Sequence, residues 1–454
     1  MYQKPSIPKG TRDFSPSVVL KRNYIMEHIQ LVFQRYGFLP IETPSMENLS
    51  TLTGKYGEEG DRLIFKILNS GDFLKKVDST EALEAKQLIP KISDKALRYD
   101  LTVPLARYVV KHMNEIVIPF KRYQMQTVWR ADRPQKGRFR EFYQCDADIV
   151  GSSSLLCEIE LIQLYDAVFS TLKVPTIIKL NNRKILSGIA QVLGEEDKLI
   201  AMTVALDKLD KIGLEKVKEE MLGNGISQDA IDKIDPIINL KGSITEKLTQ
   251  LRAVLNDSSI GMDGISEIEE VFDKIKMLGL ESSILDFDIT LARGLNYYTG
   301  TIFEVQAQGV SLGSIGGGGR YDDLTGIFGL KDMPGIGISF GLDRIYLVLE
   351  ELGLFPDLED NLSQVLFVNF GHSEADFCLK SLTQIRRAGI NAELYPDSSK
   401  MKKQMTYAHK KNIPFVVLVG EDEVALNLLT VKNMNDGSQS RYSVTELISL
   451  IHSQ

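Results

Sequence analysis

The stretch that decides the fold is "VWRADRPQKGRFREFYQ", which runs from Val128 to Gln144. On either side, in residues 118–131 and 139–151, apolar and polar residues alternate as they do in half-buried strands. Pro134 and Gly137 interrupt the alternation and indicate a turn. Between residues 130 and 140 the chain carries five cations against one acid. The pattern therefore predicts a long antiparallel hairpin with a cationic loop.

The composition is typical of a globular protein with two or three domains. The chain has 454 residues, 43% of them hydrophobic and 25% charged, and a net charge of -8. This charge argues against adhesion to nucleic acid over the whole surface but allows local basic patches. Because no apolar run could span a bilayer and the start lacks a signal-peptide core, we expect a cytoplasmic protein without membrane contact. Its three cysteines are too few for a disulfide framework and lack metal-ligand spacing.

Three patterns divide the rest of the chain. Residues 18–34 have apolar positions at helical spacing, and an extended segment containing Pro40 and Pro44 follows them. Residues 183–283 are helical in pattern and interrupt two strand-rich regions, so we expect an inserted helical domain. After a linker near residues 354–363, short apolar strands alternate with helices, which indicates βαβ units and a mostly parallel sheet.

Polar side chains recur at alternate positions of the predicted strands. If residues 100–102 are extended, Asp100 and Thr102 share a face, and Gln144, Asp146 and Asp148 share a face of the second hairpin strand. Carboxylates on a sheet face usually meet solvent. Here their apolar and aromatic neighbours favour a polar pocket on an antiparallel sheet, and both interpretations remain open.

Glycine-rich segments raise the question of a nucleotide site. The segment "GSIGGGGRYDDLTG" (313–326) lacks the lysine and hydroxyl of a P-loop, and "GIGISFG" (335–341) does not fit the dinucleotide fingerprint. The alternative is structural, because glycine lets strands approach closely or bend. A third segment, "LARGLNYYTG" (291–300), places an arginine and two tyrosines on a bend between strand-like runs.

These segments together resemble a known family. The hairpin resembles motif 2 of class II aminoacyl-tRNA synthetases, "GIGISFGLDRIYLVLEE" resembles motif 3, and the early helix ending in "FLPIETPSMEN" resembles motif 1. The segments "KGTRDF", "LRYDLTVPLARY" and "LARGLNYYTGTIFE" are similar to histidyl-tRNA synthetases in particular. The resemblance implies an α+β catalytic domain with an antiparallel sheet, in residues 1–182 and 284–352, interrupted by a helical domain in residues 183–283. It also implies a C-terminal α/β anticodon-binding domain in residues 362–454.

The same resemblance implies a reaction in two steps, in which ATP activates L-histidine and the histidine passes to tRNA(His). It assigns Arg130 and Arg293 to catalysis at the α-phosphate. Histidine would be bound by Asp100, Thr102, Gln144, Asp148, Tyr297 and Tyr298. ATP would be bound by Arg130, Arg138, Phe142 and Arg344, with Mg²⁺ held through the phosphates and no dedicated metal site.

The resemblance further implies a homodimer and contacts with tRNA. Candidate contacts are Lys136 in the hairpin loop and Lys400, Lys402 and Lys403 in the terminal domain. Those lysines could equally form a solvated surface. Asn296 stands where the family usually has aspartate, a change that alters hydrogen bonding without removing a catalytic group.

Two other classes of protein compete with this interpretation. A catalytically inactive, synthetase-like regulatory subunit of histidine biosynthesis generally lacks the anticodon-binding domain and substrate residues, and both are expected here. A synthetase-like RNA-binding sensor module would accompany a kinase, and the sequence has no kinase pattern.

Overall fold

The computed structural model describes residues 4–54, 57–77, 84–292, 298–357 and 363–453. The chain divides into two compact units, one of residues 1–14 with 21–355 and the other of residues 15–20 with 356–454. Each unit has its own hydrophobic core.

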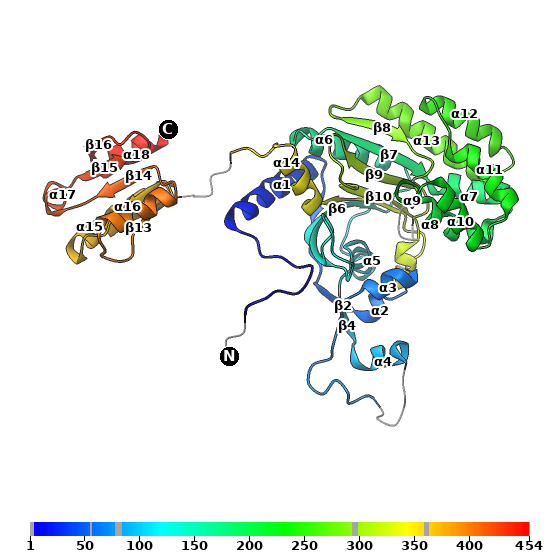
Figure 1. Ribbon diagram of the computed structural model, residues 1–454, viewed down its shortest axis with the longest axis horizontal. Coiled ribbons are helices and arrows are strands. Elements are labelled where there is room, and N and C mark those ends of the chain that lie inside the picture. Colours follow the sequence, from blue (N-terminus) through cyan, green and yellow to red (C-terminus); the bar gives the residue numbers. More distant parts are fainter. Residues whose placement is uncertain (1–3, 55–56, 78–83, 293–297, 358–362, 454) are drawn as a thin grey trace. The chain divides into compact units, whose positions relative to one another are not determined.

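An eight-stranded sheet organises the first unit, in the order β1-β5-β6-β11-β10-β9-β7-β8 (Figure 1). Its strands are β1 (Leu39–Pro40), β5 (Phe120–Trp129), β6 (Glu141–Val150), β11 (Gly335–Gly341), β10 (Gly316–Tyr321), β9 (Thr301–Ala307), β7 (Thr176–Asn182) and β8 (Ser283–Phe287). The two outermost pairs, β1 with β5 and β7 with β8, are parallel, and all the pairs between them are antiparallel. The predicted antiparallel sheet is confirmed.

The predicted hairpin forms the second and third strands of this sheet, next to the edge strand β1. Strands β5 and β6 pair in antiparallel register from Phe120 opposite Val150 to Trp129 opposite Glu141. Side chains alternate along β6 as expected, since Cys145 and Ala147 enter the core whereas Gln144, Asp146 and Asp148 line a pocket. Because of this alternation, one face of β6 is apolar and packs in the core, whereas the other face is polar and lines the pocket.

Three helices complete the core of the sheet: α1 (Pro16–Arg35), α6 (Leu156–Thr171) and α14 (Leu342–Glu351). The predicted early helix is confirmed, with Ile25, Ile29 and Phe33 buried at helical spacing. From α6, Tyr165 and Phe169 pack against Phe340 of β11, with ring centroids 4.8 and 5.6 Å away. Aromatic packing thus holds β11 against α6.

A smaller layer stands beside the hairpin. A second sheet, in the order β2-β4-β3, is made of β2 (Met46–Asn48), β4 (Lys95–Leu97) and β3 (Lys66–Ile67). The accompanying helices are α2 (Leu49–Leu52), α3 (Gly57–Leu63), α4 (Ala85–Ile92), α5 (Thr102–Lys111) and the 3₁₀ helix η2 (Leu324–Phe328). The extended conformation considered for residues 100–102 is wrong, because α5 begins at Thr102. Asp100 accepts the backbone N–H of Val103 at 3.1 Å and so ends the extended segment.

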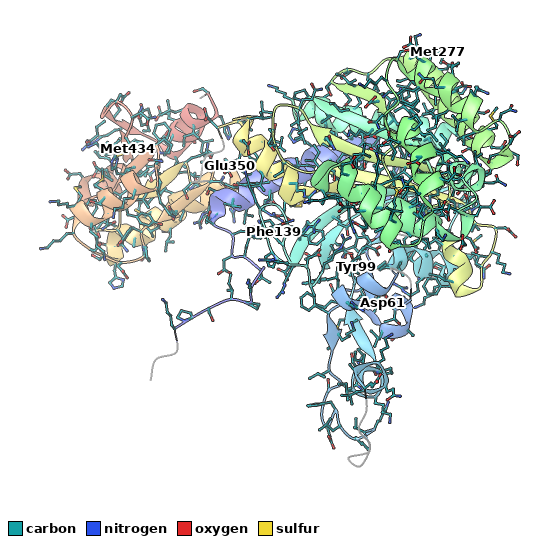
Figure 2. All side chains as sticks on the ribbon, turned by 45° about the vertical axis from the view of Figure 1, so that its right-hand side comes forward. Asp61, Tyr99, Phe139, Met277, Glu350 and Met434 are labelled. Atoms are coloured by element: carbon teal, nitrogen blue, oxygen red, sulfur yellow. The ribbon has the colours of Figure 1, made fainter. Side chains whose placement is uncertain are left out.

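Between β7 and β8 the chain forms a helical block, residues 183–278 (Figure 1). Its helices are α7 (Arg183–Val192), η1 (Glu196–Lys198), α8 (Leu199–Leu206), α9 (Leu209–Ile212), α10 (Leu214–Gly223), α11 (Gln228–Ile238), α12 (Ile244–Val254) and α13 (Ser259–Leu278). Its apolar side chains continue the core of the sheet, whereas Met277 of α13 is 76% exposed on its outer surface (Figure 2). Of the helices described, none is both long and apolar enough to cross a membrane.

The second unit contains a five-stranded sheet in the order β13-β12-β14-β15-β16. Its strands are β12 (Val365–Phe367), β13 (Ala392–Leu394), β14 (Phe415–Leu418), β15 (Leu429–Asn433) and β16 (Gln439–Tyr442), with helices α15 (His372–Arg387), α16 (Met401–Lys410), α17 (Glu421–Leu426) and α18 (Val444–His452). The predicted strand and helix alternation is confirmed for β12 to β14, which are parallel. The sheet is mixed rather than mostly parallel, because β15 and β16 form a hairpin that pairs antiparallel with β14.

Candidate active site

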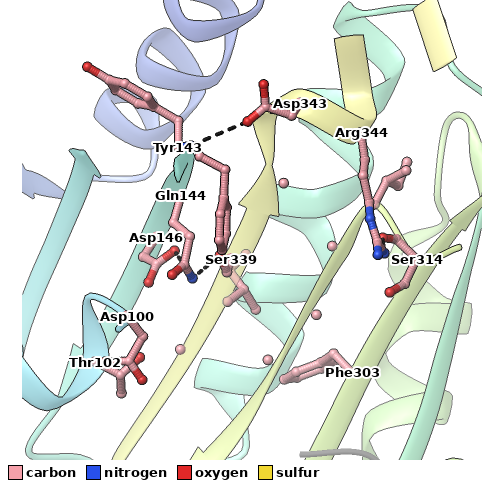
Figure 3. Close-up of a pocket in the computed structure, with 18 of the residues that line it drawn as sticks. Asp100, Thr102, Tyr143, Gln144, Asp146, Phe303, Ser314, Ser339, Asp343 and Arg344 are labelled. Atoms are coloured by element: carbon pink, nitrogen blue, oxygen red, sulfur yellow. Dashed lines mark hydrogen bonds between the residues drawn. The ribbon is translucent and has the colours of Figure 1, made fainter. Parts of the chain in front are cut away.

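The candidate active site is a cavity of about 300 Å³ on one face of the eight-stranded sheet (Figure 3). Strands β6, β10 and β11 form its floor, and the hairpin loop and the start of α5 contribute walls. The cavity brings together nine predicted site residues: Asp100, Thr102, Arg130, Arg138, Phe142, Gln144, Asp148, Tyr298 and Arg344. Arg293, Asn296 and Tyr297 lie outside the described residues. The polar-pocket interpretation of the β6 acids therefore holds against the solvent interpretation.

One side of the cavity is cationic and aromatic. Arg130 follows β5 directly, and its Nε donates to the carbonyl oxygen of Tyr99 at 3.1 Å. Its guanidinium carbon lies 4.3 Å from the ring centroid of Tyr99 and 5.3 Å from that of Phe142. These contacts hold the cation over aromatic faces without neutralising it, so its charge remains available to an anion.

The hairpin loop is tied to the start of α14 by Arg344. Its Nε donates to the carbonyl oxygen of Gly137 at 3.1 Å, and its Nη1 donates to that of Ser314 at 2.6 Å. Figure 3 shows Arg344 and Ser314 across the cavity from Gln144 and Asp146. Arg138 of the loop lines the same end of the cavity. Two arginines of the hairpin connection, Arg130 and Arg138, thus meet Arg344 of α14 around one space.

The floor holds Asp148 in a defined orientation. Arg122, directly opposite on β5, places its Nη2 2.7 Å from Asp148 Oδ2, and the Tyr321 hydroxyl donates to Oδ1 at 2.6 Å. Burial raises the pKa of Asp148, while Arg122 and Tyr321 act to lower it. Neither Arg122 nor Tyr321 was predicted from the sequence. Period-two spacing on β5 could have revealed the buried cation opposite an acid, whereas Tyr321 comes from a distant strand.

Glycine at position 337 makes room for this carboxylate. A Cβ there would lie 1.9 Å from Asp148 Oδ1. Gly337 is the register partner of Asp148 on β11, so a side chain would occupy the space of the acid itself. The close-approach interpretation of "GIGISFG" is thereby confirmed at this residue.

Asp146 occupies the next pocket-facing position and was given no role from the sequence. Gln144 Nε2 donates to Asp146 Oδ1 at 3.4 Å and to Ser339 Oγ at 3.0 Å. Burial, ahead of the neighbouring charges, raises the pKa of Asp146 to about 7. Ser339, also missed, lies opposite Asp146 on β11. The acidic end of the cavity is therefore larger than predicted.

An ion cluster supports the outer wall. Asp343 of α14 accepts from Arg12 at 2.6 Å and from Arg22 at 2.5 Å, and its second oxygen accepts the backbone N–H of Tyr143 at 3.4 Å. The guanidinium of Arg12 also lies 3.2 Å from the ring centroid of Phe139 in the hairpin loop. The segment "KGTRDF" therefore braces the loop, a role that its sequence alone does not reveal.

The predicted tRNA-contacting lysines do not line the cavity floor. Lys136 of the hairpin loop lies 3.2 Å from Glu351. Lys400, Lys402 and Lys403 are exposed at the start of α16 in the second unit.

Each of the two units matches a known protein-family model. Residues 10–345 match the model described as "Histidyl-tRNA synthetase", and residues 364–454 match "Anticodon binding domain". Among curated proteins, a histidine–tRNA ligase of Christiangramia forsetii is 64% identical over 97% of both chains. Another of Phocaeicola vulgatus is 58% identical over 99% of this chain and 100% of its own.

Solved structures agree with the sequence comparisons. A histidyl-tRNA synthetase from Nostoc sp. PCC 7120 has 33% identity and a TM-score of 0.80, and the match covers 100% of both chains. A Bacillus halodurans structure titled as an ATP phosphoribosyltransferase regulatory subunit/histidyl-tRNA synthetase shares the fold at 19% identity, with a TM-score of 0.73 over 91% of this chain and 99% of its own. Because the family model matches most of the chain and these relatives are 58% and 64% identical over nearly its full length, the chain belongs to the histidyl-tRNA synthetase family.

Proposed function

We propose that the protein is a histidine–tRNA ligase that forms histidyl-adenylate and pyrophosphate from histidine and ATP, then transfers histidine to the 3′ end of tRNA(His). The observation that carries this proposal is the division of one cavity into an arginine-rich end and a carboxylate-rich end. An amino acid and ATP present the matching charges, because the amino acid offers a cation and ATP offers phosphates.

At the carboxylate end, Asp100, Thr102 and Gln144 would surround the α-ammonium group, which requires oxygen acceptors. Asp148, with Tyr298 and Tyr297, would bind the imidazole through its ring nitrogens. The contacts of Asp148 with Arg122 and Tyr321 support this role, since a carboxylate held in one orientation discriminates between side chains by hydrogen-bond geometry.

At the arginine end, the histidine carboxylate attacks the α-phosphate, and the bond to the β,γ-pyrophosphate breaks. Arg130 would stabilise the charge that develops on the α-phosphate, with Arg293 as its counterpart from the other side. Phe142 would stack on adenine, while Arg344 and Arg138 would bind the outer phosphates. Mg²⁺ would be held through phosphate oxygens. Over the described part of the chain, no group of three or more His, Cys, Asp or Glu residues could hold a metal ion.

For the second step, Lys136 would face the acceptor stem, and Lys400, Lys402 and Lys403 would contact tRNA from the terminal domain. Residues 183–283 would act as an inserted domain, residues 1–182 and 284–352 as the catalytic domain, and residues 362–454 as the anticodon-binding domain. We also propose a homodimer, which rests on the resemblance of residues 18–48 to motif 1.

The inactive regulatory subunit is not favoured. Such subunits generally lack an anticodon-binding domain, whereas residues 364–454 match one. The cavity also retains the polar side chains that substrate binding requires.

Histidine-dependent exchange of labelled pyrophosphate into ATP, without tRNA, tests the proposal. We expect exchange with histidine and none with the other amino acids. A Lys233→Ala variant, which alters an exposed residue of α11, should exchange normally, whereas Arg130→Ala should lose exchange with little change in histidine affinity. Folded wild-type protein that exchanges no pyrophosphate would instead support the regulatory subunit.

A further inference from the structure

Asp146 is a buried acid in the cavity to which the proposed function assigns no role. Its side chain is 3% exposed and lines the cavity beside Gln144 and Asp148. Across the described residues it forms no ion pair, although Asp148, two positions away, pairs with Arg122. A buried carboxyl group without an ion pair of its own is costly unless it keeps its proton or receives a cation from a ligand.

The neighbours of Asp146 are already engaged. The Tyr321 hydroxyl donates to Asp148 Oδ1 at 2.6 Å, and Asp148 Oδ2 forms an ion pair with Nη2 of Arg122 at 2.7 Å, although the geometry of that contact is not that of a hydrogen bond. The amide nitrogen of Gln144 donates to Asp146 and Ser339, while its Oε1 atom is buried with no hydrogen-bond partner in the described residues. This part of the wall therefore presents acceptors and requires a donor with several N–H groups.

We propose that Asp146 is the counter-ion of the α-ammonium group of bound histidine, an inference that rests on the function proposed above. Its carboxyl group holds a proton in the empty pocket. When histidine binds, the ammonium group takes the place of that proton, which is released to solvent, and the carboxylate and ammonium form an ion pair. Asp100 and Gln144 then complete the acceptors around the same nitrogen.

The charges around Asp146 favour this exchange. Asp146 interacts electrostatically with Asp148 from β6, Arg122 from β5 and Asp100 from the segment before α5, and also with Cys145 and Tyr165, which lie in the hydrophobic core. Strand β11 contributes the neutral Ser339. Among the residues that the structure describes, these three carboxyl groups therefore share the guanidinium of Arg122, so their joint ionisation leaves excess negative charge around it. The raised pKa of Asp146, about 7, agrees with a proton retained near neutrality.

Calorimetry of histidine binding in buffers of different ionisation enthalpy tests the proposal on the unmodified protein. At about pH 6 we expect net release of about half a proton or more per histidine, beyond that of an Asp146→Asn variant. Because the imidazole of histidine contributes equally in both proteins, the difference reports Asp146. Equal proton exchange in the two proteins would overturn the proposal.

Pyrophosphate exchange supplies a second readout. At about pH 8, Asp146→Asn should raise the KM for histidine by about 10- to 100-fold, with the KM for ATP unchanged. Asp94→Asn, at an exposed acid outside the cavity, should match the wild type. If the wild type exchanges with histidine and Asp146→Asn keeps its KM, this inference alone fails. If the wild type does not exchange at all, the proposed function fails with it.

Discussion

The contribution of Arg122 to stability depends on its ion pair with Asp148. Arg122 is fully buried, and its ion pair with Asp148 is the main compensation for two desolvated charges. Replacement by methionine keeps the volume of the stem and leaves Asp148 without its cation. We expect Arg122→Met to reduce the free energy of unfolding by about 3–5 kcal/mol, measured by urea denaturation.

An exposed ion pair provides the matched control for Arg122. Lys233 and Asp229 lie 2.6 Å apart in α11 with both side chains mostly exposed, so Lys233→Ala should cost about 1 kcal/mol or less. The double variant Arg122→Met/Asp148→Leu should recover part of the stability, because no buried charge remains. An Arg122→Met variant as stable as Lys233→Ala would contradict the burial argument.

Asp146 should also impose a pH dependence on the stability of the ligand-free protein. Its pKa is raised from 3.8 to about 7 in the folded state, so the folded protein binds more protons than the unfolded chain between those values. Stability contributed by this group is therefore complete at low pH and is lost as pH rises toward 7. The total loss is on the order of 4 kcal/mol.

The Asp146→Asn variant isolates this contribution. We expect the free energy of unfolding of the wild type to fall, relative to that of the variant, between about pH 4 and pH 7, and the difference to stay constant above that range. Other acids titrate in both proteins and cancel. A difference between wild type and variant that does not change with pH would show that Asp146 ionises normally.

Strands β10 and β11 can pair only because they are rich in glycine. A Cβ on Gly318 would lie 2.1 Å from the carbonyl oxygen of Gly337 and 2.8 Å from Cα of Ile338, both backbone atoms that cannot rotate away. Gly318→Ala should therefore destabilise the first unit by about 1–3 kcal/mol, measured by thermal or urea unfolding.

Gly223 is the control for this substitution. It ends helix α10, and no atom lies within 4 Å of a Cβ built there. Gly223→Ala should be neutral or stabilising by up to about 1 kcal/mol, since alanine is the better helix former. Equal effects at the two positions would mean that strand spacing is not set by glycine.

The elements show which features local sequence can predict. The β5–β6 hairpin and α1 could be predicted from periodicity, because each has one apolar face that packs in the core and one face with more polar residues. The β15–β16 hairpin was missed, since its strands are short and "QSRY" is polar and exposed. The start of α5 was missed because Asp100 accepts the N–H of Val103, a local contact that ends the extended segment.

The active site likewise contains residues that local sequence predicts and residues that it does not. Its arginines and acids are recognisable from residue type and alternation, and nine predicted residues line one cavity. Tyr321, Ser339 and Asp343 come from strands and a helix far along the chain, so only the sheet register brings them to the pocket. Their identification requires the pairing of β6 with β11 and of β11 with β10, which no local pattern specifies.

For the chain as a whole, the remaining question is how a protein of net charge -8 binds a polyanion. Local clusters suffice if they neutralise a few phosphates, and the exposed Lys400, Lys402 and Lys403 at the start of α16 form one such cluster. Their replacement by glutamine should raise the KM for tRNA and reduce the salt dependence of aminoacylation, by a slope of about 0.7 for each phosphate that the protein no longer neutralises.

The same triple replacement should leave histidine-dependent pyrophosphate exchange unchanged, because these lysines lie in the second unit and the cavity lies in the first. Glutamines at Lys380 and Arg387, exposed on α15 of the same unit, provide the control for non-specific loss of positive charge. If these controls weaken tRNA binding as much as the triple variant, net charge rather than a docking surface on α16 governs the interaction. A reduced salt slope confined to the α16 variant would place phosphates of the tRNA against that helix.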